Sequence, residues 1–225
     1  MGNRKAKFAN GECYHVFNRG VDKRDVFLDQ KDYERFLLAM NLLNDETDGL
    51  MIQWRDYSKL NPKAKPSEFL RLSLRSDGKK PLVEIIAYCL NSNHYHFILK
   101  QLAERGIERF MQKLGTGYTM YFNQKNNRSG SLFQGPFKAI HIDSNEYLLY
   151  VSAYVNKNNF IHGYTKDDSW KYSSLPEYLG KVNPGICSKE IILGQFKNVS
   201  DYKKFTEINA KYLKEKKEAE KYLLE

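Results

Sequence analysis

The chain has few cysteines and no long apolar run. Its three cysteines, at positions 13, 89 and 187, lie far apart, so they form neither the paired spacing of a zinc site nor the framework of a small secreted domain. No apolar stretch is long enough to span a bilayer, and residues 1–10 are polar and basic. We therefore expect no membrane partner and no signal peptide, and a reduced, cytoplasmic setting.

The sequence also lacks internal repeats, low-complexity tracts and a Walker-type phosphate loop. These absences argue against a repeat architecture and against an enzyme driven by ATP. Of the 225 residues, 41% are hydrophobic and 28% are charged, which suits one globular domain with an appendage.

Positive charge is in excess and is unevenly spread. The formal net charge of +9 favours a polyanionic partner, with nucleic acid ahead of an anionic membrane surface. Residues 55–80 carry eight Lys or Arg against three acids, a net charge of +5. This concentration indicates contact with phosphates, although a solvated basic loop would have the same composition. The candidate DNA-binding residues in it are Arg55, Lys59, Lys63, Lys65, Arg71, Arg75, Lys79 and Lys80.

Six segments alternate between strand and helix patterns. Strands have β-rich composition, helices have apolar residues three and four apart, and a turn at 91–93 joins the two central strands. The order strand, helix, strand, strand, helix, strand predicts an α+β fold, a ferredoxin-like split βαβ antiparallel sheet with helices on one face. The segments are 12–19, 29–43, 82–90, 94–100, 104–124 and 131–142, in that order, the last with an interruption at Gly135-Pro136.

Three further segments complete the chain. Turn signals such as Asn61-Pro62 indicate that residues 45–80 are a basic insertion. A helix capped by Ser144 is expected to carry Tyr154 and Asn158. We predict a catalytic domain over 1–165, with the insertion at about 45–80, and a partly helical C-terminal extension over 166–225.

The extension ends in a charged helix over 201–225 with an apolar stripe. Because an isolated helix of this length is marginal in water, the stripe must pack on something. We expect it to dock on the same chain, which favours a monomer, whereas pairing with a second protomer would make a homodimer. The stripe consists of Tyr202, Phe205, Tyr212 and Leu213.

Two short patterns carry candidate chemistry. His94 and His96 are two apart on a predicted strand, so they share a face and could hold one divalent metal, although two structural histidines would have the same spacing. Tyr154 and Asn158 are four apart on a predicted helix, and an amide oxygen suits Mg²⁺ or Mn²⁺. In isolation, this second pair also fits an ordinary surface helix.

Ordered segments around these residues resemble one family. The sequence AYCLNSNHYHFIL at 87–99 is similar to the HUH segment of single-tyrosine, IS200-like transposases, and closest to their REP-associated branch. Further agreement is found in YHVFNRG at 14–20, GSLFQGPFK at 130–138, YVNKN at 154–158, and the stretch 170–180. The resemblance therefore covers roughly residues 12–180.

The resemblance implies a chemistry and a set of residues. It implies an HUH nuclease fold in which His94, His96 and Asn158 hold Mg²⁺ or Mn²⁺ and Tyr154 attacks single-stranded or hairpin DNA, forming a 5′-phosphotyrosine and leaving a 3′ hydroxyl. It also implies a prokaryotic, nucleoid-associated endonuclease and strand transferase. Four cations in or beside the matching segments are further candidate DNA-binding residues: Arg19, Arg128, Lys138 and Lys157.

The chain departs from the family pattern at three places. Asn91-Ser92 stands where the family often has Met-Pro, Asn159 follows Asn158 where a proline is common, and Ala153 precedes Tyr154 where an arginine is common. The missing arginine suggests that another cation, for example from the basic insertion, holds the phosphate.

Three questions stay open at this stage. Tyr150 and Tyr154 have the Tyr-x3-Tyr spacing of some rolling-circle initiators and relaxases, although no helicase segment follows. A domesticated transposase that binds hairpins without cleaving them is a second alternative. No general base is evident, and His15 and His141 fit structural histidines better than catalytic ones.

Overall fold

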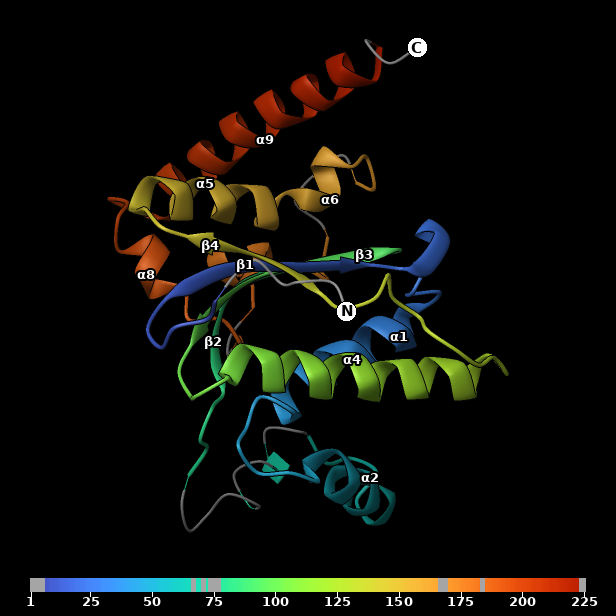
Figure 1. Ribbon diagram of the computed structural model, residues 1–225. Helices are drawn as coiled ribbons and strands as arrows, with labels where there is room; N and C mark the ends of the chain where they lie inside the picture. Colours follow the sequence, from blue (N-terminus) through green and yellow to red (C-terminus); the bar gives the residue numbers. More distant parts are fainter. Residues whose placement is uncertain are drawn as a thin grey trace.

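The structure is a computed structural model that describes residues 7–65, 68–69, 72, 78–165, 170–182 and 185–222. Its centre is an antiparallel sheet of four strands in the order β2-β3-β1-β4 (Figure 1). The strands are β1 (Cys13–Arg19), β2 (Val83–Asn91), β3 (His94–Gln101) and β4 (Lys138–Ile142). This order confirms the predicted α+β, ferredoxin-like arrangement.

The strand predicted over 131–142 is shorter than expected. Only Lys138–Ile142 pairs with β1, and before it a single bridge joins Phe133 to Gly20. Gly135 has a φ of +68°, and Pro136 after it cannot donate a backbone hydrogen bond, so the segment cannot continue the ladder. The interruption that the sequence indicated at Gly135-Pro136 therefore lies before the strand, which begins at Lys138.

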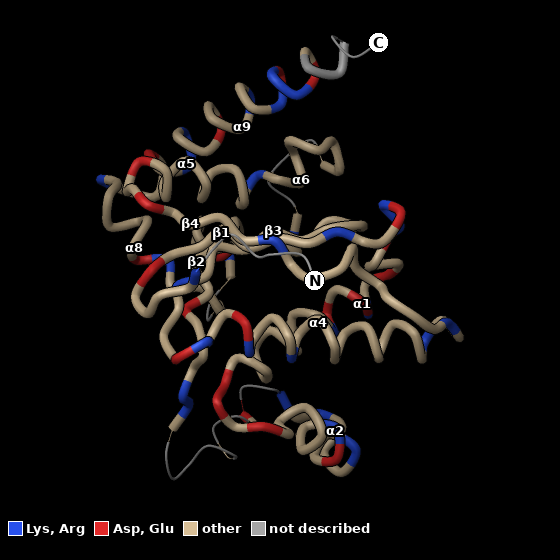
Figure 2. Tube along the Cα trace, in the orientation of Figure 1, with Lys and Arg blue, Asp and Glu red and all other residues tan. Residues whose placement is uncertain are grey.

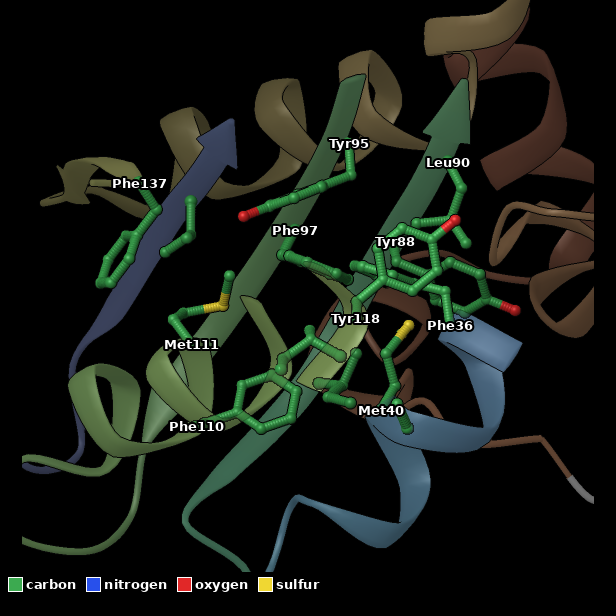
Figure 3. Close-up of a cluster of buried hydrophobic side chains, with 14 of the residues drawn as sticks. Phe36, Met40, Tyr88, Leu90, Tyr95, Phe97, Phe110, Met111, Tyr118 and Phe137 are labelled. Atoms are coloured by element: carbon green, nitrogen blue, oxygen red, sulfur yellow. The ribbon is translucent and has the colours of Figure 1, made fainter. Parts of the chain in front are cut away.

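Two helices pack on one face of the sheet and form the larger core. They are α1 (Gln30–Leu42) and α4 (Gly106–Lys125), and the Asp29 side chain caps α1 by accepting a bond from the Asp32 backbone N–H at 3.1 Å. Figure 3 shows Phe36 and Met40 of α1 beside Phe110 and Tyr118 of α4, below Phe97 of β3. The apolar spacing that predicted these helices is what fills this layer.

Helices also cover the opposite face, so the prediction of helices on one face only is corrected. That face carries α5 (Asn145–Asn156), α6 (Asn158–Ile161), α8 (Glu190–Leu193) and α9 (Val199–Tyr222), and its apolar core joins β2 and β3 to α5 and Tyr202 (Figure 1). The reason lies in β2 and β3, whose side chains are buried on both faces, so each face needs a cover. Two short elements, η1 (Val21–Lys23) and α7 (Leu175–Tyr178), lie outside these two layers of helices.

The basic insertion contains a helix that its turn signals did not indicate. Helix α2 (Leu50–Leu60) packs through Leu50 and Trp54 on Leu42 of α1 and on Phe69. It lies on the far side of α1 and α4 from the sheet (Figure 1). Leu50, Trp54 and Tyr57 recur at helical spacing, a signal that was present in the sequence.

The C-terminal helix docks on the same chain, as predicted, but with a different stripe. Tyr202, Thr206 and Ala210 are buried against α5, whereas the Tyr212 side chain is 59% exposed. The spacing of four residues in the buried set follows one face of an α-helix. No helix in the described part of the chain is both long enough and apolar enough to cross a membrane.

Candidate active site

The two histidines of the HUH segment lie side by side at the start of β3. His94 pairs with Asn91 of β2 and with Arg19 of β1, and His96 pairs with Phe17. Their ring centres are 5.2 Å apart, and both side chains are buried, at 6% and 7% exposure. They project from the sheet face that α5 and α6 cover, so the alternation of a strand brings them together as the sequence predicted.

Tyr154 and Asn158 reach the histidines from the covering helices, but not from one continuous helix. Helix α5 ends at Asn156, Lys157 has φ −109° and ψ 13°, and Asn158 begins α6. The Tyr154 ring centre is 5.4 Å from that of His96, and Asn158 Oδ1 is 3.0 Å from His94 Nε2. The prediction of a shared helix is wrong, but the four proposed residues are still brought into one place.

Two lone pairs converge between His94 and Asn158. His94 Nδ1 is 2.6 Å from Asn93 Oδ1, which can only accept, so Nδ1 carries the proton and Nε2 presents its lone pair. Burial lowers the pKa of His94 to about 4, so the ring is neutral at physiological pH. Nε2 therefore faces the carbonyl oxygen of Asn158 with no proton between them. Two acceptors at this separation fit a cation that binds both.

Asn91 is a third polar group at this point, which the sequence marked only as a departure from the family pattern and not as a site residue. Its side chain is fully buried, and its Nδ2 lies 2.6 Å from Asn158 Oδ1 and 3.0 Å from His94 Nε2. The position opposite His94 across the predicted hairpin was the available signal. No three His, Cys, Asp or Glu side chains form a metal-binding group in the described ranges, so the donor set here is two imidazoles with amides.

His15 orients His96. The two rings are stacked, with His15 Nε2 2.9 Å from His96 Nδ1. If His96 donates this hydrogen bond, its Nε2 is left with a lone pair that can bind a metal, and burial keeps His15 neutral by lowering its pKa to about 4. His141, the other histidine considered, lies on the exposed side of β4 and bonds Glu12 at 2.9 Å.

The Tyr154 hydroxyl is protonated at neutral pH. Burial raises its pKa above the ordinary value, and a hydrogen bond with Asn158 lowers it only in part. A phenol in this state is a weak nucleophile.

A pocket of about 260 Å³ opens over these side chains, and two positively charged side chains line it. Arg19 and Lys138, both predicted to bind DNA, line it together with His94, His96 and Tyr154. Arg19 Nε is buried and has no hydrogen-bond partner among the described residues. An unpaired guanidinium N–H in a pocket with a tyrosine is a candidate phosphate contact.

The described part of the basic insertion does not supply this cation, so the expectation is corrected for Arg55, Lys59, Lys63, Lys65, Lys79 and Lys80. Helix α2 lies beyond α4, on the opposite side of the sheet from α5 and α6, and carries one acidic residue, Asp56, between Arg55 and Lys59 (Figures 1 and 2). Arg55 is paired with Asp56 at 2.9 Å, and Lys79 Nζ donates to the Asn41 backbone oxygen at 3.3 Å. Arg71 and Arg75 lie outside the described residues.

Two other residues predicted to bind DNA make contacts within the protein instead of lining the pocket. Lys157 is 5% exposed, with its Nζ 5.9 Å from the centre of the Phe160 ring, which is the position of a packed residue and not of a surface phosphate contact. Arg128 donates to the Ser131 backbone oxygen at 3.0 Å in the turn after α4 and does not line the pocket.

The C-terminal extension reaches the rim of the pocket. Lys217 of α9 donates to His162 Nδ1 at 2.6 Å, and the His162 ring centre is 4.9 Å from that of His94. The His162 ring lines the pocket, and its pKa is lowered to about 3 by burial and by the charge of Lys217. Sequence spacing could not reveal this contact, since it joins residues far apart in the chain.

Comparison with known proteins agrees with the resemblance. Residues 61–158 match the family model described as "Transposase IS200 like", a segment that contains both histidines, Tyr154 and Asn158. The recognition of this family from sequence is therefore confirmed over that segment, and it supports a transposase function. No curated protein matches the sequence.

The fold is similar to a solved structure of a REP-associated tyrosine transposase bound to a REP hairpin. The TM-score is 0.50 at 15% sequence identity, and the match covers 80% of this chain and 87% of that one. At this identity the likeness shows a shared fold.

Proposed function

We propose that this chain, whose residues 61–158 carry the IS200-like transposase sequence, cleaves and rejoins single-stranded DNA at or near hairpins through a phosphotyrosine at Tyr154. The proposal rests on the position of Tyr154. Its ring centre is 5.4 Å from that of His96, next to the pair of acceptors formed by His94 Nε2 and Asn158 Oδ1. The solved structure with the similar fold holds a hairpin, which favours hairpin DNA here also. Such an activity belongs with chromosomal DNA in a prokaryotic cytoplasm.

His94, His96 and Asn158 are the side chains that would hold a divalent cation, Mg²⁺ or Mn²⁺. The fit rests on the 3.0 Å approach of His94 Nε2 to Asn158 Oδ1 and on the buried Asn158 Nδ2, which has no hydrogen-bond partner among the described residues. A bound cation would neutralise charge that develops on the phosphoryl oxygens and would favour the phenolate of Tyr154.

The remaining steps are the work of the chain's own residues. Arg19 and Lys138 bind the phosphate in the pocket, and the Tyr154 hydroxyl oxygen attacks phosphorus in line with the departing oxygen. Tyr154 gives up its hydroxyl proton as the P–O3′ bond breaks, the departing 3′ oxygen takes up a proton to become a 3′ hydroxyl, and the 5′ phosphate stays on Tyr154. A new 3′ hydroxyl can reverse the step, so rejoining needs no ATP.

Tyr150 does not share this position. It is half-buried against the apolar core on the α5 side of the sheet and does not line the pocket that contains Tyr154. The two-tyrosine chemistry of rolling-circle initiators is therefore disfavoured. A hairpin-binding protein without catalysis is the remaining alternative, and cleavage assays separate it from the proposal.

The test uses labelled single-stranded oligonucleotides that contain the hairpins flanking the gene, with Mg²⁺ or with EDTA. We expect the full chain to cleave in Mg²⁺ only, and the Tyr154→Phe variant to bind the same DNA without cleaving it, because the attacking hydroxyl is gone. Tyr150→Phe is the matched control and should cleave like wild type. Cleavage by Tyr154→Phe, or undiminished cleavage in EDTA, would contradict the proposal.

A further inference from the structure

Asn91 ends β2 directly opposite His94, and its amide is part of the candidate metal site. The side chain is fully buried on the sheet face that contains both histidines. Its outer amide atom touches two of the proposed ligands, Asn158 Oδ1 at 2.6 Å and His94 Nε2 at 3.0 Å.

These contacts form a triangle. The third side, between His94 Nε2 and Asn158 Oδ1, is 3.0 Å long. Adjacent ligands of Mg²⁺ in octahedral coordination are about 2.9 Å apart, because each lies about 2.05 Å from the ion at a right angle to its neighbour. The three atoms therefore have the spacing of one face of such an octahedron, with Asn91 at one corner.

The corner atom of Asn91 is the amide nitrogen, Nδ2. An N–H donor in that place satisfies two lone pairs that would otherwise face each other. A half-turn of the amide about its last bond exchanges Oδ1 and Nδ2 with little change in position. The thiol of Cys89, 3.7 Å from Asn91 Oδ1, tolerates either end because sulfur in a thiol both donates and accepts weakly.

We propose that Asn91 is a fourth protein ligand of the divalent cation, turning its amide so that Oδ1 replaces Nδ2 when the cation binds. This inference rests on the proposed function, since it concerns the same site. It assigns a role to one of the places where the chain departs from the family pattern, which often has methionine at this position. An amide oxygen in place of a thioether makes the ligand set harder and favours Mg²⁺ and Mn²⁺ over softer metals.

Calorimetric titration of Mn²⁺ into the full chain, without DNA, tests the inference. Asn91→Leu removes the oxygen at nearly constant volume and should weaken Mn²⁺ binding about tenfold or more. Asn91→Asp places a charged oxygen there and should tighten it. Asn126→Ala, which removes an asparagine at the end of α4, is the matched control and should bind like wild type.

NMR of the Asn91 side-chain amide provides a second measurement. In spectra of the ¹⁵N-labelled chain, the side-chain NH₂ resonances of Asn91 should shift on addition of Mg²⁺, because the group leaves the two acceptors. Mn²⁺ binding by Asn91→Leu that is equal to wild type, or tighter, would overturn the inference and mean that the amide only blocks the site. If the leucine variant does not fold, unchanged or weaker Mn²⁺ binding by Asn91→Asp has the same consequence.

The outcomes for the inference and for the proposed function are distinguishable. If wild type cleaves DNA in a metal-dependent way while Asn91→Leu keeps full Mn²⁺ affinity, the role of Asn91 fails and the proposed function stands. If wild type binds Mn²⁺ through Asn91 but cleaves none of the hairpins, the proposed function fails and the assignment of Asn91 stands.

Discussion

At the residue scale, the candidate metal ligands are buried polar groups that are neutral. His15 and His94 each have a pKa of about 4, because burial penalises the imidazolium form. Neutral imidazoles have the lone pairs that a metal needs, so the burial that lowers these pKa values also prepares the site. The consequence is a loss of folding stability at acid pH.

The acid dependence of stability can be predicted with its sign. His15 has a folded pKa of about 4 against an ordinary value of 6.5, so between these pH values the unfolded chain binds more protons. Its contribution is fully present above pH 6.5 and is lost as pH falls towards 4, at up to about 1.4 kcal/mol per pH unit for each such histidine. We expect the free energy of unfolding in EDTA to fall steadily as the pH is lowered through this range.

Replacement of His15 tests whether its burial causes the loss of stability at acid pH. His15→Gln should make the slope of unfolding free energy against pH shallower over that range, measured by urea denaturation. His141→Gln is the control for loss of an imidazole at the surface. A slope identical in wild type and His15→Gln would show that His15 is not held neutral by burial.

The sequence predicted part of this site for a clear reason. His94 and His96 are local on one strand, and Tyr154 and Asn158 were found through an ordered motif. Asn91, His15 and His162 were not found, because their proximity depends on strand register and on the break between α5 and α6. Nothing in the spacing of the chain encodes those contacts directly.

At the element scale, apolar periodicity predicted the helices that pack on the sheet, but it failed where elements break. The helix expected from Ser144 through Asn158 stops at Asn156, and the break allows the Asn158 amide to turn towards His94. Helix α2 was hidden by the turn signals and the charge around it. The stripe of α9 was predicted correctly at Tyr202 but missed Thr206 and Ala210, because these buried side chains are smaller than the aromatic ones that the pattern emphasised.

The position of α2 sharpens the prediction for the basic insertion. Changing the exposed Lys59, Lys63 and Lys65 to Ala should weaken binding across many DNA sequences. It should also flatten the dependence of affinity on salt, by roughly 0.7 log units per decade of salt for each phosphate that is no longer neutralised. Cleavage at saturating DNA should not change, because the insertion is on the other side of the sheet from Tyr154. Binding isotherms at several salt concentrations provide the measurement.

A charge-matched control separates phosphate binding from net charge. Lys31, Lys181 and Lys197 are exposed lysines outside the insertion, and changing them to Ala removes the same charge. If the DNA affinity of the two triple variants depends equally on salt concentration, the insertion does not bind phosphates and is a solvated basic segment.

At the scale of the whole molecule, the sheet separates two surfaces with different roles. The face under α5, α6 and α9 contains the candidate active site, and the face under α1 and α4 carries the insertion (Figure 1). DNA that touches both must pass around an edge of the sheet. Since Tyr202 of α9 is buried within the same chain, one protomer encloses its own site, and the monomer stays a prediction that follows from this docking.

The covalent product of cleavage identifies the residue that attacks the DNA. The wild-type chain is incubated with a hairpin oligonucleotide and Mg²⁺, denatured and digested with trypsin and nuclease. Trypsin releases Tyr147, Tyr150 and Tyr154 in one peptide, residues 139–157, so fragmentation in the mass spectrometer must locate the added nucleotide. The account predicts a 5′-linked nucleotide on Tyr154. A nucleotide on Tyr150, or cleavage that leaves no nucleotide on the protein, would contradict it.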